Sequence, residues 1–344
     1  MSSRHQGLGG KPLGSDSPLF GGESEPEKAN GSTDAVPPGA VPPWDPRSDP
    51  YAAEVDPEPS PQELAAAEAQ LESLRDLLPA AEDGRSLDDW GRSEAVVSLI
   101  DPLLNFYYRY WFRVETEGIE NIPTNGGALL VSNHSGALPP DGPMIMQAIR
   151  NEHPSPRALY MLGEHWFKGY PGVAMIANKM GLVPAHRDNA QRLLHDEGRL
   201  AVVFPEGQKG TRKLYWQRYR LRRFGRGGFV RTAIRARVPI VPIALVGGEE
   251  AMPIFAHLRL LQKLSGLIYF PVTPTFPLFG LAAGMLYMPA KFRIRFLEPI
   301  DMSQYPPETA SDPAAIQEIS EKIRAGIQIQ LDQMISRRKS VWMG

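Results

Sequence analysis

Cysteine is absent from the 344 residues of this sequence. Disulfide bonds, thiolate zinc sites, iron–sulfur clusters and a cysteine nucleophile are therefore excluded. The sequence also lacks the GxSxG motif of serine hydrolases, and its first ten residues, MSSRHQGLGG, lack the apolar core of a secretory signal. We expect no metal site, because no histidine and carboxylate pair has the helical spacing of metal ligands. The missing cysteine and signal fit a protein of the reducing cytoplasm.

No uninterrupted apolar run reaches the roughly 20 residues that a membrane-spanning helix needs. Residues 264–290 come closest, since they contain no charged residue, but four prolines interrupt them. Proline breaks helices, so this segment is a poor candidate for a single span. We expect it to be buried in the protein or to lie in a membrane interface.

Charge is distributed unevenly along the chain. The totals of 37 Lys and Arg against 39 Asp and Glu give a net charge of −2. Residues 1–100 hold 7 basic and 19 acidic residues, whereas residues 101–344 hold 30 and 20. Within the acidic part, 26 of the first 59 residues are Gly, Pro or Ser, a composition typical of a flexible tail. We therefore expect residues 1–59 to be disordered.

Two helical segments follow this tail. Ser60 precedes Pro61 and Glu63, an arrangement that caps helices, and leucines then recur at helical spacing up to residue 78. Residues 93–112 form a second helical stretch, and its latter half is rich in aromatic side chains. Such a stretch packs in a core or lies in a bilayer interface, and both alternatives stay open.

Short apolar segments alternate with helical ones from residue 128 onward. The sequence predicts strands at residues 128–132, 158–162, 200–204, 239–246 and 292–297, and helices at residues 142–150, 166–180, 228–237 and 314–335. This alternation favours an α/β fold with a mostly parallel, or mixed, central sheet flanked by helices. Pro239 and Pro242 favour an edge or bent position for the fourth of these strands.

The sharpest local feature is the run NHSGALPPD, directly after the first predicted strand. His134 leaves the carboxyl end of that strand, where open α/β sheets bind ligands. Asp141, seven positions later on a loop with glycine and prolines, can fold back and accept a hydrogen bond from one imidazole nitrogen. The other nitrogen could then take a proton from an alcohol. Taken alone, such a pair is more often found in helix caps and turns.

Three further blocks come near the ends of apolar segments. FPEG, with Glu206 and Gly207, closes the third strand; GLVPAHR ends in Arg187; and VPIVPI begins at Val238. Together with NHSGALPPD, these blocks resemble, in this order, the glycerolipid acyltransferase family, the group that contains the 1-acylglycerol-3-phosphate acyltransferases.

The resemblance covers residues 112–299, a little over half of the chain. Family members usually have four residues between the histidine and the aspartate, and this sequence has six. With the run YFPVTPTFP at residues 269–277, the longer loop looks like that of a bacterial branch related to monoacylglycerol and diacylglycerol acyltransferases.

The resemblance implies a role for each block. His134 would be the general base and Asp141 the carboxylate that orients it, so that a lipid hydroxyl attacks the thioester of acyl-CoA or of acyl-carrier protein. No covalent acyl-enzyme is needed in such a reaction. Arg187 would hold a phosphate of the acceptor, while Glu206 and Gly207 would bind its glycerol part. No cofactor is implied besides the acyl donor.

Basic residues concentrate beside the FPEG block. Residues 204–237 hold eleven Lys and Arg residues and a single acidic residue, Glu206. A solvated basic face, nucleic-acid binding through interleaved aromatic residues, and attraction to phosphates are the alternatives. Because the run lies among the acyltransferase blocks, we expect it to attract phosphates of CoA, of the acceptor or of anionic lipids, with Lys209 and Arg212 in contact with substrate. We expect no nucleic acid.

The sequence thus predicts a membrane-associated O-acyltransferase that converts lysophosphatidate to phosphatidate on the cytoplasmic face of the cell membrane. Residues 60–112 would form a helical membrane-proximal segment, and residues 113–344 the acyltransferase domain. A neutral mono- or diacylglycerol, or another lysolipid, is an alternative acceptor. A non-catalytic lipid- or acyl-CoA-binding protein is the alternative from a different class. His165 and His186 could also contact substrate.

Overall fold

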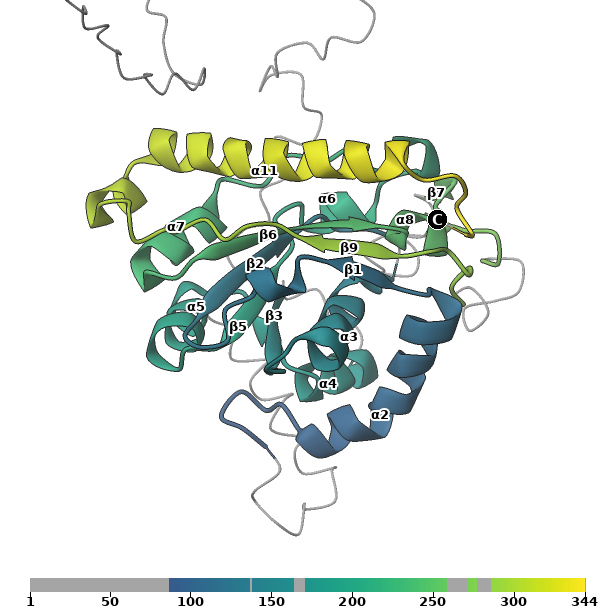
Figure 1. The fold of residues 1–344 in the computed structure, drawn as a ribbon, viewed down its shortest axis with the longest axis horizontal. Helices are drawn as coiled ribbons and strands as arrows, with labels where there is room; N and C mark the ends of the chain where they lie inside the picture. Colours follow the sequence, from purple (N-terminus) through teal and green to yellow (C-terminus); the bar gives the residue numbers. More distant parts are fainter. Residues whose placement is uncertain (1–86, 137, 164–170, 259–270, 277–285, 344) are drawn as a thin grey trace, which may run out of the picture. The chain divides into compact units, whose positions relative to one another are not determined.

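A seven-stranded sheet is the framework of the structure (Figure 1). The computed structural model describes residues 87–136, 138–163, 171–258, 271–276 and 286–343. All of these residues belong to one compact unit, Ala66–Gly344. The predicted tail, the predicted helix at residues 60–78 and most of the uncharged segment at residues 264–290 lie outside the described residues.

The strands of this sheet follow the order β1-β9-β6-β2-β5-β3-β4. Every neighbouring pair is parallel except β6 and β9, which are antiparallel. The predicted α/β fold with a mostly parallel, mixed sheet is therefore confirmed. The strands are β1 (Glu115–Glu117), β2 (Ala128–Ser132), β3 (Leu159–Gly163), β4 (Leu182–Pro184), β5 (Leu200–Val203), β6 (Ile240–Val246) and β9 (Arg293–Phe296). Two short strands, β7 (Ala256–His257) and β8 (Pro271–Val272), form a separate pair.

Helices cover both faces of the sheet (Figure 1). α7 and α11 pack on one face and α3 packs on the other, while α2 lies against α3. The longer described helices are α2 (Glu94–Phe106), α3 (Asp141–Glu152), α4 (Pro171–Lys179), α7 (Gly228–Ala236) and α11 (Pro313–Ser336). The shorter ones are α5 (Arg187–Gln191), α6 (Gln208–Thr211), α8 (Gly248–Ala251), η2 (Tyr107–Trp111), η3 (Ile119–Asn121), η5 (Arg192–Asp196), η6 (Tyr215–Gln217) and η7 (Pro307–Ser311).

The core explains why β2 is apolar at successive positions. Side chains of a strand alternate between the two faces of a sheet. Leu129 and Val131 pack in the cluster of α7 and α11, whereas Leu130 packs in the cluster of α3. All five residues of β2 are buried, because helices cover both faces of this parallel part of the sheet.

The predicted edge position of the strand with two prolines is wrong, because β6 lies inside the sheet between β9 and β2. Ile240 exchanges backbone hydrogen bonds with Ile300, and the Pro242 carbonyl accepts one from the Leu297 N–H. Residues two apart face the same neighbour, so the missing N–H of Pro242 faces the stretch between Leu297 and Ile300, beyond the end of β9. The parallel pairing of β6 with β2 on the other side continues through Pro242, so the proline does not disrupt that side of the strand.

The helical stretch predicted at residues 93–112 is confirmed as α2 followed by the π-helical turn η2. Ser93 caps α2, since its hydroxyl accepts a hydrogen bond from the Val96 N–H at 3.3 Å. The aromatic side chains divide between buried and exposed positions. Tyr108 and Phe112 are buried, whereas Phe106 and Tyr110 are exposed. Within the described part of the chain, every helix is too short or too polar to span a bilayer.

Candidate active site

His134 and Asp141 form a hydrogen-bonded pair at the carboxyl end of β2. Asp141 is the first residue of α3, and its Oδ2 lies 2.9 Å from His134 Nδ1. Because the carboxylate accepts this bond, Nδ1 carries the proton and Nε2 is the nitrogen that can receive another. The imidazole stacks on the Phe204 ring, with 4.3 Å between the ring centroids. The Asp141 side chain is fully buried, whereas that of His134 keeps 14% exposure. Such an arrangement can orient a histidine so that it accepts a proton from an alcohol.

Ser135 supplies two more hydrogen bonds to the same carboxylate. Its backbone N–H donates to Asp141 Oδ2 at 2.8 Å, and its hydroxyl donates to Oδ1 at 2.5 Å. A buried carboxylate is costly unless such donors compensate for lost water. Ser135 therefore fixes the orientation in which Asp141 faces the histidine.

Asn133 fastens the start of this loop to the neighbouring strand β6. Its side-chain amide donates to the Leu245 carbonyl at 2.9 Å, and its side-chain oxygen accepts from the Leu245 N–H at 2.8 Å. The side chain thus replaces a backbone ladder pair at the point where β2 ends. His134 consequently leaves a fixed strand end rather than a loose loop.

Glu206 connects the FPEG turn after β5 to His134. Its Oε1 accepts a hydrogen bond from the His134 backbone N–H at 2.9 Å, and its Oε2 accepts one from the Arg222 backbone N–H at 2.8 Å. The ammonium of Lys213 lies 3.3 Å from Oε2. The Glu206 side chain has no exposed surface, and internal donors occupy both oxygens. This geometry is that of a residue that positions its neighbours, and the predicted contact with the acceptor stays a prediction.

Gly207 and α6 place the other predicted FPEG residues. Gly207 has φ 54° and ψ −147°, a conformation open mainly to glycine, and its N–H closes the turn to the Phe204 carbonyl. Lys209 follows on α6 and is exposed. Arg212, directly after α6, is half-buried, and its carbonyl accepts a hydrogen bond from His257 Nε2 at 2.9 Å.

Arg187 lies on the same edge of the sheet but farther to the side. It begins α5 shortly after β4, and its side chain is exposed. No described side chain pairs with its guanidinium. In the sheet order β4 lies three positions from β2, and steps of about 4.8 Å put the two strands about 14 Å apart. Neighbouring His186 is also exposed and caps α5, while His165 lies outside the described residues.

The basic run divides into buried and exposed members. Lys213 is buried between Glu206 and Glu249, so it does not belong to a solvated basic face. Exposed arginines of the run include Arg220 and Arg226. The attraction to phosphates predicted for the run can therefore come only from part of it.

Tyr287 ties the loop of His134 to the aromatic turn η2. Its hydroxyl donates to the Leu138 carbonyl at 3.0 Å, and its own carbonyl accepts a hydrogen bond from Trp111 Nε1 at 3.0 Å. Burial raises the pKa of the Tyr287 phenol, and the nearby Asp141 charge adds to this effect. The hydroxyl therefore stays protonated and serves as a donor to the loop.

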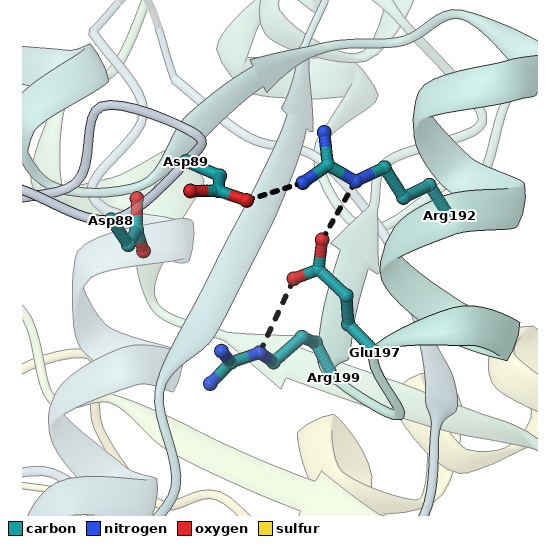
Figure 2. A pocket seen from close by; sticks show the side chains of 5 residues that line it. All are labelled: Asp88, Asp89, Arg192, Glu197 and Arg199. Atoms are coloured by element: carbon teal, nitrogen blue, oxygen red, sulfur yellow. Dashed lines mark hydrogen bonds and ion pairs between the residues drawn. The ribbon is translucent and has the colours of Figure 1, made fainter.

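A separate charged pocket of about 470 Å³ lies at the opposite edge of the sheet (Figure 2). Arg192 contacts Asp89 at 2.6 Å and Glu197 at 2.9 Å, and Glu197 also contacts Arg199 at 3.5 Å. Arg199 directly precedes β5, so this pocket is at the amino end of that strand, whereas Glu206 follows its carboxyl end. The pocket is thus separate from the His134 site. Among the described residues, no group of three or more acidic or histidine side chains is placed to hold a metal ion.

Comparison with known proteins identifies the family. A family model described as "Acyltransferase" matches residues 113–246, the range that contains His134, Asp141, Arg187 and Glu206. An uncharacterized protein of Mycobacterium tuberculosis is 43% identical over 260 residues, which cover 75% of this chain and 72% of that protein. The Gallus gallus protein named "DGAT1/2-independent enzyme synthesizing storage lipids" is 28% identical over 247 residues, covering 72% and 66%. The chain belongs to the glycerolipid acyltransferase family.

This acyltransferase is an enzyme rather than the non-catalytic binding protein that the sequence left as an alternative. Among solved structures, the 1-acyl-sn-glycerophosphate (LPA) acyltransferase of Thermotoga maritima matches 79% of this chain and 90% of its own, with 17% identity and a TM-score of 0.47.

Sequence reasoning missed part of the candidate site. No role was assigned to Asn133 or Ser135, although both stand next to His134. The run GGEE at residues 247–250 directly follows β6, and it was overlooked. The rule that singled out His134 and Glu206, polar residues at the carboxyl end of an apolar strand, applies equally to this run.

We predict that Gly248→Ala impairs the acyltransferase by displacing Asp141. An added Cβ would stand 1.9 Å from Ser135 Oγ and 2.7 Å from Asp141 Oδ1, so both side chains must move. A shift of about 1 Å in a catalytic pair can lower kcat by about 100-fold. Steady-state kinetics of the purified enzyme measure the loss.

Gly326→Ala is the matched control. Gly326 lies within α11, and a Cβ there meets no atom within 4 Å. This change should leave kcat unchanged and raise the free energy of unfolding by about 0.5–1 kcal/mol through helix propensity. Wild-type kcat in Gly248→Ala would contradict the close packing of Gly248 against Ser135 and Asp141.

Proposed function

We propose that this enzyme transfers a fatty acyl group from acyl-CoA or acyl-carrier protein to a glycerolipid hydroxyl, converting lysophosphatidate to phosphatidate. The observation that carries the proposal is the 2.9 Å contact between His134 Nδ1 and the fully buried Asp141. It supports His134 as the general base, because Nε2 is left to accept the proton of an alcohol.

The proposed reaction proceeds without a covalent enzyme intermediate. His134 Nε2 takes the proton of the acceptor hydroxyl as its oxygen forms a bond to the thioester carbonyl carbon. The tetrahedral intermediate then collapses, the carbon–sulfur bond breaks, and the leaving thiolate receives that proton from the imidazolium. Asp141 stabilises the imidazolium between the two steps.

Arg187 supports a phosphate-bearing acceptor. Its guanidinium is exposed, lies on the same edge of the sheet as His134, and has no partner among the described side chains. A planar guanidinium binds phosphate through paired hydrogen bonds. With about 14 Å between β4 and β2, the headgroup would extend across the ends of β5 and β3.

A neutral acceptor is a second candidate, and the similarity to the Gallus gallus protein favours it. That protein is named as an enzyme that synthesizes storage lipids. Supplying lysophosphatidate, monoacylglycerol and diacylglycerol in parallel to the purified enzyme decides between the candidates. A higher kcat/KM for a neutral acceptor than for lysophosphatidate would show that the neutral lipid is the preferred substrate.

Exposed basic residues near the FPEG turn support a phosphorylated donor. Lys209 on α6 lies one position from Gly210, whose backbone packs against His134 and Glu206. Arg220 and Arg226 are exposed farther along the same run. We assign these residues and Arg212 to the phosphates of acyl-CoA or of acyl-carrier protein, with no metal or cofactor involved.

Membrane association is supported by an apolar stripe on α2 and η2. Leu99, Leu103, Phe106 and Tyr110 follow helical spacing, and each exposes between 46% and 80% of its surface. A row of this size exposed to water is unusual in a soluble protein and suits a bilayer interface. We call these four residues the α2 stripe and propose that it docks on the cytoplasmic face of the cell membrane.

The α2 stripe is coupled to the active site through η2. Trp111 follows Tyr110 and donates to the Tyr287 carbonyl, while the Tyr287 hydroxyl donates to Leu138 in the loop between His134 and Asp141. A helix docked on a membrane would therefore hold this loop at a defined place relative to the bilayer. Such a placement favours delivery of a lipid acceptor to His134.

We predict that His134→Ala lowers kcat by about 10²- to 10⁴-fold, the usual contribution of a general base. Asp141→Ala should also lower kcat, with some residual activity because the imidazole remains. Radiolabelled acyl transfer to lysophosphatidate measures both. His195→Ala is the control, since His195 is exposed and precedes the amino end of β5. Substantial activity in His134→Ala would contradict the proposal that His134 is the general base.

Arg187→Ala should raise the KM for lysophosphatidate by about tenfold or more, because a charge-assisted phosphate contact is lost. The KM for monoacylglycerol and the kcat should change little. Arg235→Ala, an exposed arginine on α7, serves as the control for charge alone. Equal changes in the KM for both acceptors would show that Arg187 does not bind the phosphate of lysophosphatidate.

Replacing Leu99, Leu103 and Tyr110 by serine should weaken binding to lipid vesicles by about 100-fold or more, given the free energy of burying such side chains. Vesicle flotation with mixed phosphatidylglycerol and phosphatidylcholine measures the change. Ile329→Ser is the control, because Ile329 is an exposed apolar residue on α11. Unchanged flotation of the triple variant would rule out the α2 stripe as the docking surface.

A further inference from the structure

A cluster of buried charged side chains contacts the backbone of His134. Lys213 Nζ is 3.3 Å from Glu206 Oε2 and 2.7 Å from Glu249 Oε1. The Lys213 side chain is only 1% exposed, and both carboxylates are buried as well. We call Glu206, Lys213 and Glu249 the buried triad.

The buried triad joins the loops that follow three adjacent strands. Glu206 follows β5 and holds the backbone N–H of His134, which follows β2. Glu249 follows β6, and its Oε2 accepts a hydrogen bond from the Tyr219 N–H at 2.6 Å. Lys213 is the cation that both carboxylates share, so it connects the GGEE run to the His134 loop.

The charges of the buried triad depend on one another. Burial alone would lower the pKa of Lys213, but Glu206 and Glu249 outweigh burial and raise it. Burial raises the pKa of Glu249, against the attraction of Lys213. Without Lys213, two buried carboxylates would face each other with no cation, and such an arrangement forces proton uptake, water entry or movement.

We propose that Lys213 is a positioning residue for the acyl-transfer reaction, because its ammonium keeps Glu206 in the orientation that holds the His134 backbone. Two consecutive contacts support this role. Lys213 contacts Glu206, and Glu206 Oε1 accepts from the His134 N–H at 2.9 Å. A displaced Glu206 releases that N–H, so His134 moves relative to Asp141. This inference rests on the proposed function of His134 as the base.

A merely structural ion cluster would make a different prediction. Loss of Lys213 would then lower the melting temperature and leave the kinetics of the folded enzyme unchanged. A positioning role instead predicts a lower kcat at temperatures where the variant is folded, with the KM of donor and acceptor nearly unchanged. It also predicts a change in the hydrogen bond between His134 and Asp141.

The test uses Lys213→Met in the full-length enzyme. We expect kcat to fall by about 10- to 100-fold well below the melting temperature, with the KM of acyl-CoA and of lysophosphatidate within about twofold of wild type. In ¹⁵N-histidine NMR spectra, the Nδ1–H signal of His134 should exchange faster or disappear. The control is Ile323→Ala, a buried change on α11 that lowers stability without touching the triad. It should keep wild-type kcat and the same Nδ1–H signal.

A second variant keeps the test decisive if Lys213→Met does not fold. Lys213→Met with Glu249→Met replaces one buried ion pair by apolar side chains, an exchange that proteins often tolerate. Glu206 then lacks its cation while the fold is retained, so kcat should again fall and the Nδ1–H signal should again exchange faster or disappear. Wild-type kcat and an unchanged signal in a folded variant would overturn the proposal.

Wild type and His134→Ala in the same assay separate the two hypotheses. An inactive wild type, or an active His134→Ala, contradicts the proposed function, and the NMR signal still reports on Lys213. Active wild type, inactive His134→Ala and wild-type kinetics in the Lys213 variants contradict the positioning role alone.

Discussion

The rest of the site depends on the hydrogen bonds and the ion pair that the buried carboxylate of Glu206 makes. A carboxylate with no exposed surface must receive its hydrogen bonds from the protein, and here the donors are the backbone of His134, the backbone of Arg222 and the ammonium of Lys213. His134 lies in the loop after β2, whereas Lys213 and Arg222 lie in the basic run that follows the FPEG turn. Satisfying one buried charge therefore brings the histidine loop, the FPEG turn and the basic segment into a single arrangement.

The parallel sheet makes this arrangement possible. β6, β2 and β5 are consecutive neighbours that run in the same direction, so the segments NHS, FPEG and GGEE leave the same edge. Close packing then refines the fit, as Gly248 leaves room for Ser135 and Asp141. The strands supply rigid starting points, and the short polar loops need few residues to complete the site. The candidate site residues thus lie at loop ends that the hydrophobic core holds in place.

The sequence predicted the strands and the His134–Asp141 pair because both depend on local information. An apolar run marks β2, and a loop of six residues can bring a carboxylate back to the histidine before it. The burial of Lys213 could not be predicted in this way, since Glu249 lies 36 positions away and approaches only through the order of the sheet. The edge position predicted for β6 from Pro242 was wrong for the same reason. Whether the interior of a sheet accepts a proline depends on where the neighbouring strand, here β9, ends.

The distance between Arg187 and His134, the proposed base, sets a condition on the proposed acceptor. β4 and β2 are about 14 Å apart, so one molecule can engage both residues only if it lies across the strand ends rather than along them. A lysophospholipid that enters from a membrane satisfies this condition when its headgroup lies on the sheet edge and its chain stays with the bilayer. The hydrogen bonds from Trp111 to Tyr287 and from Tyr287 to Leu138 set the α2 stripe relative to that edge. If the α2 stripe docks on a membrane as proposed, the same contacts through η2 would also set the orientation of the acceptor.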